Sequence, residues 1–306
     1  MTGESATLTD DVAMANQYAV WKLTVPTARN LCILADNEAI AGATLIGEQG
    51  SVFTVAVPVV TSKTITVVAS DDDNNCYYYK KDGINLAAGK YYRSEPAMTT
   101  LGTDKNAEGG VYKITGTYSG IGNIVTIHDG KTAVLSGATI SGSSHITCKS
   151  NVTIILMGSN SITVSNSNPA IRPGESGMLT ITGTGSLTAQ GGQNNPGIGS
   201  LYSGSIGYTC GDILICGGTI DVTGGKSKEP DSAGAGIGTG TKGTCGNITI
   251  TTGVTSVTAR KGSNNGAFAL HSIGYGDPSN DSSHCGTVTI GGSTGYKTAD
   301  TYTYEP

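Results

Sequence analysis

The residues best suited to contact a ligand lie in the second half of the chain, in two polar insertions and one basic pair. Lys226-Ser-Lys-Glu-Pro-Asp231 and Asp277-Pro-Ser-Asn-Asp281 interrupt Gly-rich stretches, and Arg260-Lys261 follows a strand-like run. Cationic side chains pair with carboxylates, and a tyrosine ring offers an apolar face with a polar tip. The alternative is that these stretches are solvated loops and corners. The candidate ligand-binding residues are Lys226, Lys228, Asp231, Arg260, Lys261, Tyr275, Asp277 and Asp281.

Cleavage of a glycan demands more than binding. Hydrolysis of a glycosidic bond needs two carboxylates that face one cleft, and lyase chemistry needs a basic residue near a uronate. Acidic residues in the second half occur mostly singly, in turns, and Asp212 and Asp221 fall in different strand-like runs. No acidic pair recurs from one repeat to the next. The sequence therefore predicts a non-enzymatic protein with no catalytic residue; a polysaccharide lyase or hydrolase is the less favoured alternative.

Metal and anion sites have weaker signals. Asp71-Asp-Asp-Asn-Asn75 is interpreted as a hairpin tip, because it lacks the alternating ligand spacing and the bidentate Glu of a calcium loop. Arg172 is either a contact for an acidic sugar or a solvated corner. No cofactor is predicted, with calcium as the one alternative. Surface positions rather than a metal site are expected for the scattered histidines His128, His145, His271 and His284.

Composition narrows the class of protein. Charged residues make up 13% of the 306 residues, about half the usual share, and the formal net charge is -5. This balance gives no basic patch for nucleic acid, so no nucleic-acid partner is expected. The sequence contains no 18-residue apolar run, so no transmembrane segment is expected. Met1 is followed by Thr-Gly-Glu-Ser-Ala, so a signal peptide is not expected in this chain.

Internal repetition is the strongest signal. Corresponding glycines at positions 177, 211, 246 and 286 are 34, 35 and 40 residues apart, and each opens a unit of short strands parted by Gly-rich turns. In Asn247-Ile-Thr-Ile250 the two isoleucines share one face, and we expect Ile213 and Ile215 to stack beside them. Such stacking builds a core that one unit cannot form alone. Residues 97–306 are therefore predicted to form a right-handed parallel β-helix, with 293–306 ending the stack.

Three of the seven cysteines, Cys210, Cys245 and Cys285, directly precede repeat glycines. In a stack they would lie in line, about 4.8 Å apart between neighbours. That register allows a disulfide between repeats. The alternative is a column of small, buried, unreactive thiols.

The first segment, residues 1–96, reads as strands divided by turns. Runs of alternating apolar and polar residues end at Pro26 and Pro58, and no window holds a sustained helical period. We therefore predict a small antiparallel β-sandwich, and all-β structure for the whole chain. The expected strands are Trp21–Val25, Ser51–Val57, Thr64–Ala69 and Cys76–Tyr79, and the run Leu86–Tyr92 closes the segment.

Two resemblances accompany these patterns. Leu86-Ala-Ala-Gly-Lys-Tyr-Tyr-Arg93 resembles a motif of fimbrillin-like domains of Bacteroidetes surface proteins, over residues 18 to 93. It implies an immunoglobulin- or transthyretin-like sandwich at the cell surface, with fewer strands before Trp21 than the family usually has. Pro196 to Gly199, Ala233 to Gly238 and Ile273-Gly274 are similar to the Gly-Ile-Gly repeats of gut-bacterial surface proteins and carbohydrate-binding β-helix domains.

Together these resemblances imply an extracellular, cell-surface adhesin or fimbria-associated protein. Its partners would be host or dietary glycans, or other surface and fimbrial proteins. A carbohydrate-binding module that captures polysaccharide is the alternative function.

Overall fold

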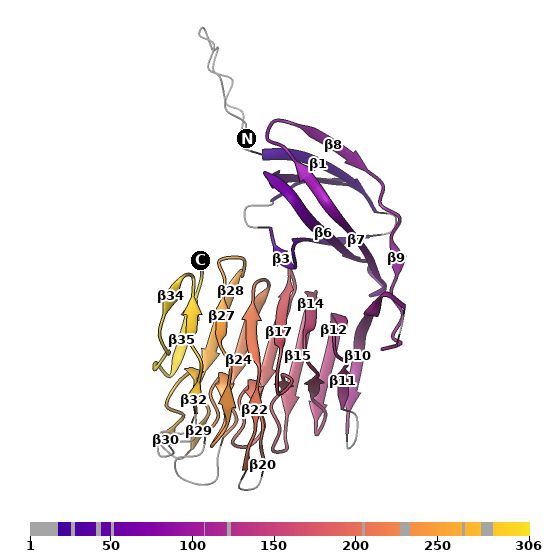
Figure 1. Cartoon of the computed structure of the whole chain (residues 1–306). Coiled ribbons are helices and arrows are strands. Elements are labelled where there is room, and N and C mark those ends of the chain that lie inside the picture. Colours follow the sequence, from indigo (N-terminus) through magenta and orange to yellow (C-terminus); the bar gives the residue numbers. More distant parts are fainter. Residues whose placement is uncertain are drawn as a thin grey trace.

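The computed structural model is all-β, with several sheets (Figure 1). Among the described residues one short 3-10 turn, Glu108–Gly110, is the only helical element. No helix in this part of the chain is long and apolar enough to cross a membrane. The structure describes residues 18–25, 28–40, 44–49, 52–106, 108–120, 124–203, 206–226, 233–264, 267–276 and 284–306.

Two sheets near the N-terminus share one apolar core. Every strand pair in them is antiparallel except β1 with β8, which is parallel. Strand β1 alternates buried and half-buried residues, so Trp21 and Leu23 face Ile65 and Val67 of the other sheet. The first sheet has the order β4 (Thr44–Gln49), β5 (Val52–Pro58), β1 (Tyr18–Thr24), β8 (Tyr91–Ser94). The second has the order β3 (Glu38–Ala39), β2 (Asn30–Ala35), β6 (Val60–Ser70), β7 (Cys76–Leu86), β9 (Thr99–Thr100).

The acidic turn lies between β6 and β7, as predicted for a hairpin tip. Asp71 accepts hydrogen bonds from the backbone N–H groups of Asp73 and Asn75 and from the hydroxyl of Tyr77. A side-chain hydrogen bond from Asn75 is the main cause that lowers the pKa of Asp71. The carboxylate therefore closes its own turn.

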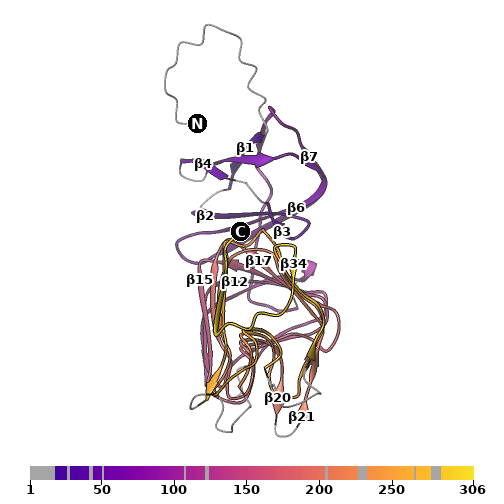
Figure 2. The same ribbon diagram turned by 90° about the vertical axis from the view of Figure 1, so that its left-hand side faces the viewer.

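The rest of the chain is dominated by three long parallel ladders, in which successive repeats place their strands side by side (Figures 1 and 2). Strand β10 (Val111–Ser119) starts the array beside β12. The first ladder contains β12 (Thr132–Gly142), β14 (Val152–Met157), β17 (Met178–Gly183), β23 (Asp212–Ile215), β27 (Ile248–Ile250) and β33 (Val288–Ile290). The second contains β12, β15 (Ser159–Val164), β18 (Ser186–Gln190), β24 (Thr219–Thr223) and β28 (Ser256–Arg260). The third contains β11 (Val125–Ile127), β13 (Ile146–Cys148), β16 (Ile171–Arg172), β19 (Ile198–Ser200), β25 (Ile237–Thr239) and β31 (Ile273–Gly274).

Apolar columns run along the ladders. In the first ladder Leu179, Ile213, Ile248 and Val288 are successive register partners, and all are at most 2% exposed. The predicted neighbour pair Ile213 and Ile248 is therefore confirmed. Because each strand buries alternate residues against the strands of the other ladders, the repeats share one continuous core.

The last residues end the array with antiparallel strands. Strand β34 (Ser293–Thr294) pairs with β33, and β35 (Thr301–Tyr304) pairs with β28. Each occupies an edge that a further repeat would otherwise extend. This agrees with the expectation that residues 293–306 end the stack.

The N-terminal sheets pack against the start of the array through a third apolar cluster. Val134 and Ile155, register partners on β12 and β14, turn away from the ladder core and meet Leu34 and Val68. Leu101, directly after β9, joins them. The two parts of the molecule are therefore held together by buried apolar side chains.

Candidate functional site

The first three strands of the third ladder place a row of side chains on the outer face of the array. Ile146 and Ile171 are register partners, both fully buried. Because side chains alternate along a strand, the next residues point outward. Thr126, Thr147 and Arg172 are paired in succession, and all three are half-buried. The register of buried isoleucines thus fixes where the guanidinium of Arg172 lies.

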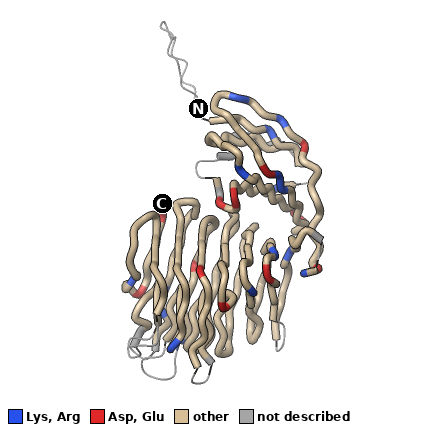
Figure 3. Tube along the Cα trace, in the orientation of Figure 1, with Lys and Arg blue, Asp and Glu red and all other residues tan. Residues whose placement is uncertain are grey.

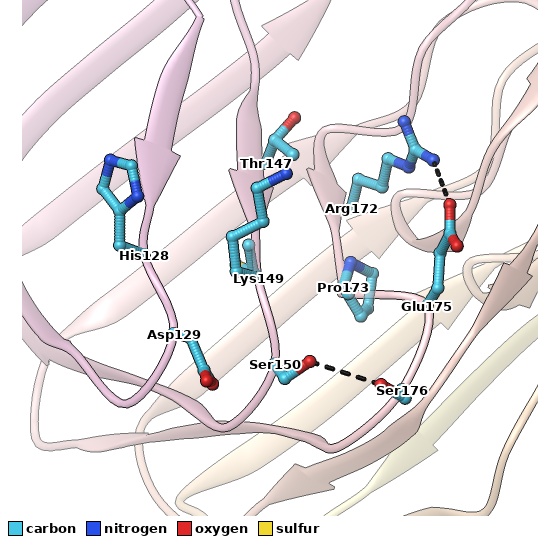
Figure 4. Close-up of a pocket in the computed structure, with 11 residues that line it drawn as sticks. His128, Asp129, Thr147, Lys149, Ser150, Arg172, Pro173, Glu175 and Ser176 are labelled. Atoms are coloured by element: carbon cyan, nitrogen blue, oxygen red, sulfur yellow. Dashed lines mark hydrogen bonds and ion pairs between the residues drawn. The ribbon is translucent and has the colours of Figure 1, made fainter.

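A groove of about 560 Å³ follows this row where the three strands end. His128 and Asp129 follow β11, Lys149 and Ser150 follow β13, and a turn after Arg172 closes the third repeat. Figure 4 shows the side chains of His128, Lys149 and Arg172 side by side, each from a neighbouring repeat. Parallel strands are about 4.8 Å apart, so three repeats span roughly 10 Å. We call this feature the Arg172 groove; it is lined by His128, Asp129, Thr147, Cys148, Lys149, Ser150, Arg172, Pro173, Gly174, Glu175 and Ser176.

Two contacts position the guanidinium of Arg172 in the groove. Its guanidinium lies 5.2 Å from the centre of the Tyr208 ring, and Nη2 lies 3.8 Å from Oε1 of Glu175. The Arg172 side chain is 23% exposed, whereas that of Glu175 is 74% exposed. Contact with an aromatic face limits the motion of a guanidinium while it leaves the N–H groups free to bind. Arg172 is thus held in place and keeps access to a ligand.

A buried histidine lies behind this row. His145 precedes β13 and is 5% exposed, and His271 is 4% exposed, so the surface positions expected from the sequence are wrong for these two histidines. Burial is the main cause that lowers its pKa, and the positive charge of Arg172 lowers it further, against a hydrogen bond with the Ser143 carbonyl. The imidazole is therefore biased to the neutral form, and the basic groups that reach the groove are Arg172, Lys149 and His128.

The groove combines cations with hydrogen-bonding oxygens. Lys149, Asp129 and Glu175 are exposed, and the hydroxyls of Ser150 and Ser176 lie 3.3 Å apart. Positions with charged residues are sparse along the array as a whole (Figure 3). Such a surface offers N–H donors to a carboxylate and oxygen acceptors to hydroxyl groups. It therefore fits a ligand that carries both groups.

The basic pair predicted from the sequence is occupied by internal partners. Arg260 forms an ion pair with Asp221 on the neighbouring strand β24, and Lys261 Nζ lies 3.2 Å from Oδ1 of Asp300. Lys226 is exposed, as predicted. The structure thus shows internal partners for Arg260 and Lys261. The predicted residues Lys228, Asp231, Asp277 and Asp281 lie outside the described residues.

Tyr275, another predicted ligand residue, belongs to a ring cluster at the far end of the third ladder. Its ring centre lies 4.3 Å from that of His271 and 5.4 Å from that of Tyr296. Burial lowers the pKa of His271, with a further contribution from Lys261 and an opposing hydrogen bond with the Tyr275 carbonyl. The cluster packs beside Gly274, which closes this face of the ladder.

Glycines occupy the outward position in the second half of the third ladder. Gly199 and Gly238 are register partners with φ values of +148° and +130°. A Cβ at Gly238 would overlap the carbonyl oxygen of Gly274, and one at Gly199 would overlap that of Gly238. Only glycine fits both the backbone conformation and the close approach. The Ile-Gly motif of the repeats is therefore required by packing at these two positions.

The sequence pointed to Arg172 but missed its neighbours. The early repeats lack regular glycines, so the register that unites His128, Lys149 and Arg172 is not visible from spacing. One signal was present: each of these three residues comes at or directly after the end of a short strand with a buried apolar residue. In the described part of the chain, three or more His, Cys, Asp or Glu side chains do not gather into a group that holds a metal ion.

Comparison with known proteins adds no relative. The chain matches no family model, no curated protein and no solved structure. Inference about function therefore starts from the geometry of the Arg172 groove.

Proposed function

We propose that this chain is a bacterial cell-surface protein that binds an acidic polysaccharide along the Arg172 groove and does not cleave it. In this proposal the three ladders are the faces of a right-handed parallel β-helix, which displays the groove, and the two N-terminal sheets are a β-sandwich. Residues 1–96 and 97–306 are the corresponding domains.

The observation that supports the proposal is the in-register row Thr126, Thr147 and Arg172 with Lys149 beside it. A polymer that runs along the array would meet one repeat after another. Uronic acid units carry a carboxylate for Arg172 and Lys149, and hydroxyls for Ser150 and its neighbours. Charge-assisted hydrogen bonds of this kind contribute about 1.5–3 kcal/mol each.

The surface location and adhesive role rest on the two resemblances. Leu86 to Arg93 resembles the fimbrillin-like motif, and this segment spans the end of β7 and most of β8. A protein that displays a binding groove needs a fixed angle between the part that attaches to the cell and the part that binds. The apolar cluster around Val134 and Ile155 forms a buried junction between the N-terminal sheets and the ladders, which would fix this angle. Attachment through the N-terminal sheets would then orient the groove. Other surface or fimbrial proteins remain proposed partners of this part.

The test is binding to polygalacturonate, with its methyl-esterified form as the matched ligand that lacks charge. We expect the acidic polymer to bind, the ester to bind at least tenfold more weakly, and added salt to weaken binding. Arg172→Gln should lose about tenfold in affinity. Arg260→Gln, which removes a cation already paired with Asp221, is the control and should change affinity less than twofold.

Equal binding of both polymers, or unchanged binding by Arg172→Gln, would overturn the proposal. Binding of polygalacturonate measured with calcium and with a chelator examines the calcium alternative; we expect the same affinity in both.

One observation favours a second function: the groove holds Asp129 and Glu175 beside Lys149 and Arg172. A polysaccharide lyase would release unsaturated uronate, which absorbs ultraviolet light. If this product forms from polygalacturonate, the chain is a lyase and not a protein that only binds the polymer.

A further inference from the structure

A column of three cysteines crosses successive repeats and begins close to Arg172, whose charge acts on Cys210. Strands β22 (Thr209–Cys210), β26 (Thr244–Cys245) and β32 (His284–Cys285) form a short parallel ladder. Cys210 is the register partner of Cys245, and Cys245 is that of Cys285. All three are free thiols, 1%, 6% and 5% exposed, in the core of the array.

From this register we propose that the column is a site of disulfide formation in which Cys245 is always one partner, so that one bond forms per chain and one thiol remains. The Cα atoms of register partners in a parallel ladder are about 4.8 Å apart, within the range of disulfides. Cys210 and Cys285 are two repeats apart, roughly 10 Å, which is too far for a bond. The central position of Cys245 therefore decides the pairing.

Contacts between the thiols agree with this order. Cys245 shares a side-chain hydrogen bond with Cys210 and another with Cys285. The other cysteines on strands lack a cysteine opposite: Cys32 faces Val68, Cys76 faces Ser70 and Cys148 faces Ile127. The column thus differs from the remaining buried thiols by its geometry.

The reaction needs a small disulfide, RSSR, as oxidant. The Cys245 thiolate attacks RSSR, forms a mixed disulfide and releases RS⁻. The sulfur of Cys210 or Cys285 then attacks the Cys245 sulfur, forms the protein S–S bond and releases a second RS⁻. Two protein protons are transferred to the two leaving groups, so one RSSR becomes two RSH while two protein thiols are oxidised.

Burial makes this reaction slow. The hydrogen bond with Cys245, together with burial, raises the pKa of Cys210 well above its usual range. The pKa of Cys245 is lowered by its bond with Cys210, but the bond with Cys285 and burial outweigh this and raise it. Because the thiolate is the attacking species, oxidation should accelerate as the pH rises.

The experiment treats the folded full chain with oxidised glutathione at mildly alkaline pH, then alkylates free thiols and maps peptides by mass spectrometry. We expect two of the seven thiols to be lost, with Cys245 linked to Cys210 or to Cys285. Cys210→Ser and Cys285→Ser should each still lose two thiols, whereas Cys245→Ala should lose none. Circular dichroism checks that the variants fold.

Peptide mapping of the unmodified chain shows directly whether Cys245 is one partner of the disulfide, even if a variant does not fold. A bond that excludes Cys245, a stable glutathione adduct in place of a bond, or retention of all seven thiols would overturn the proposal. The proposed function does not depend on this column, because Arg172→Gln and Cys245→Ala are tested by different readouts.

Discussion

The two halves of the third ladder share an inner face and differ on the outer one. Inside, Ile146, Ile171, Ile198, Ile237 and Ile273 form one column in which every residue is fully buried. Outside, the first half carries threonine and arginine, whereas the second half carries glycine. The same register therefore supports a groove lined by polar side chains at one end and a close backbone stack at the other.

This difference separates two kinds of repeat signal. The Ile-Gly motif stands out in the sequence because a Cβ is excluded wherever adjacent repeats approach closely, as at Gly238. The groove lies where the repeats are irregular, because there the outer position is free to carry Arg172 and neighbouring polar groups. In this molecule the Ile-Gly motif is explained by the close packing of adjacent repeats, and the candidate site, the Arg172 groove, lies in repeats that lack the motif.

The largest expected effect comes from Gly238→Ala, which places a Cβ against the Gly274 carbonyl at positive φ. We expect a loss of about 3–5 kcal/mol in the free energy of unfolding, measured by chemical denaturation. Gly292→Ala is the matched control, since Gly292 has a φ of +84° but nothing within 4 Å. It should cost about 1–2 kcal/mol. Equal costs would remove the close-stack explanation.

The shared inner column predicts equal costs in the two halves. Ile171→Ala and Ile237→Ala each remove a fully buried side chain, so each should lower the free energy of unfolding by about 2–5 kcal/mol. Thr147→Ala, on the outer face beside Arg172, should cost less than about 0.5 kcal/mol. If one isoleucine matters far less than the other under the same denaturant titration, the halves do not share a core.

Within the groove, Glu175→Gln removes the carboxylate that lies 3.8 Å from Arg172. The guanidinium loses an internal competitor, so affinity for polygalacturonate should rise about three- to fivefold, close to 1 kcal/mol. Stability should change little, because the Glu175 side chain is 74% exposed. Calorimetric titration measures the first quantity. A fall in affinity would mean that Glu175 itself binds the ligand.

The smallest expected effect concerns pH, and both ends of the ladder provide a probe. His145 and His271 have folded-state pKa values below the ordinary 6.5, chiefly because of burial. The unfolded chain therefore binds more protons below about pH 6.5, and the free energy of unfolding falls as the pH decreases through that window. His145→Asn and His271→Asn should each reduce this fall by less than about 1 kcal/mol between pH 7 and pH 5.

Urea titrations at the two pH values measure this change. A variant that keeps the full pH dependence of the unmodified chain would show that its histidine does not contribute. The two variants together then report whether burial is similar at the groove end and at the glycine end.

Sequence reasoning succeeded where the period was regular. Alternating isoleucines such as Ile213 and Ile248 predicted both the strands and their neighbours, because inward positions tolerate few side chains. It also located the hairpin at Asp71, since turn residues are strongly selected. It missed β2 and β4 entirely. It gave β7 only its first residues, because Tyr-Lys-Lys-Asp-Gly has no clear alternation.

The candidate site was harder to predict than the strands. Arg260 and Lys261 looked suitable as neighbours in sequence, yet each has a carboxylate partner that lies some forty residues away. Lys149 and Arg172 are separated by a whole repeat and meet only through register. Pairings of this kind depend on the tertiary fold, and a single sequence with irregular early repeats does not encode them visibly.

Hydrogen-exchange mass spectrometry with and without polygalacturonate tests the Arg172 groove most directly. The account predicts added protection in three separate segments, 125–129, 146–150 and 171–176, and none at 256–264, which holds Arg260 and Lys261. Protection of 256–264 alone, or of none of the three segments under saturating ligand, would contradict it.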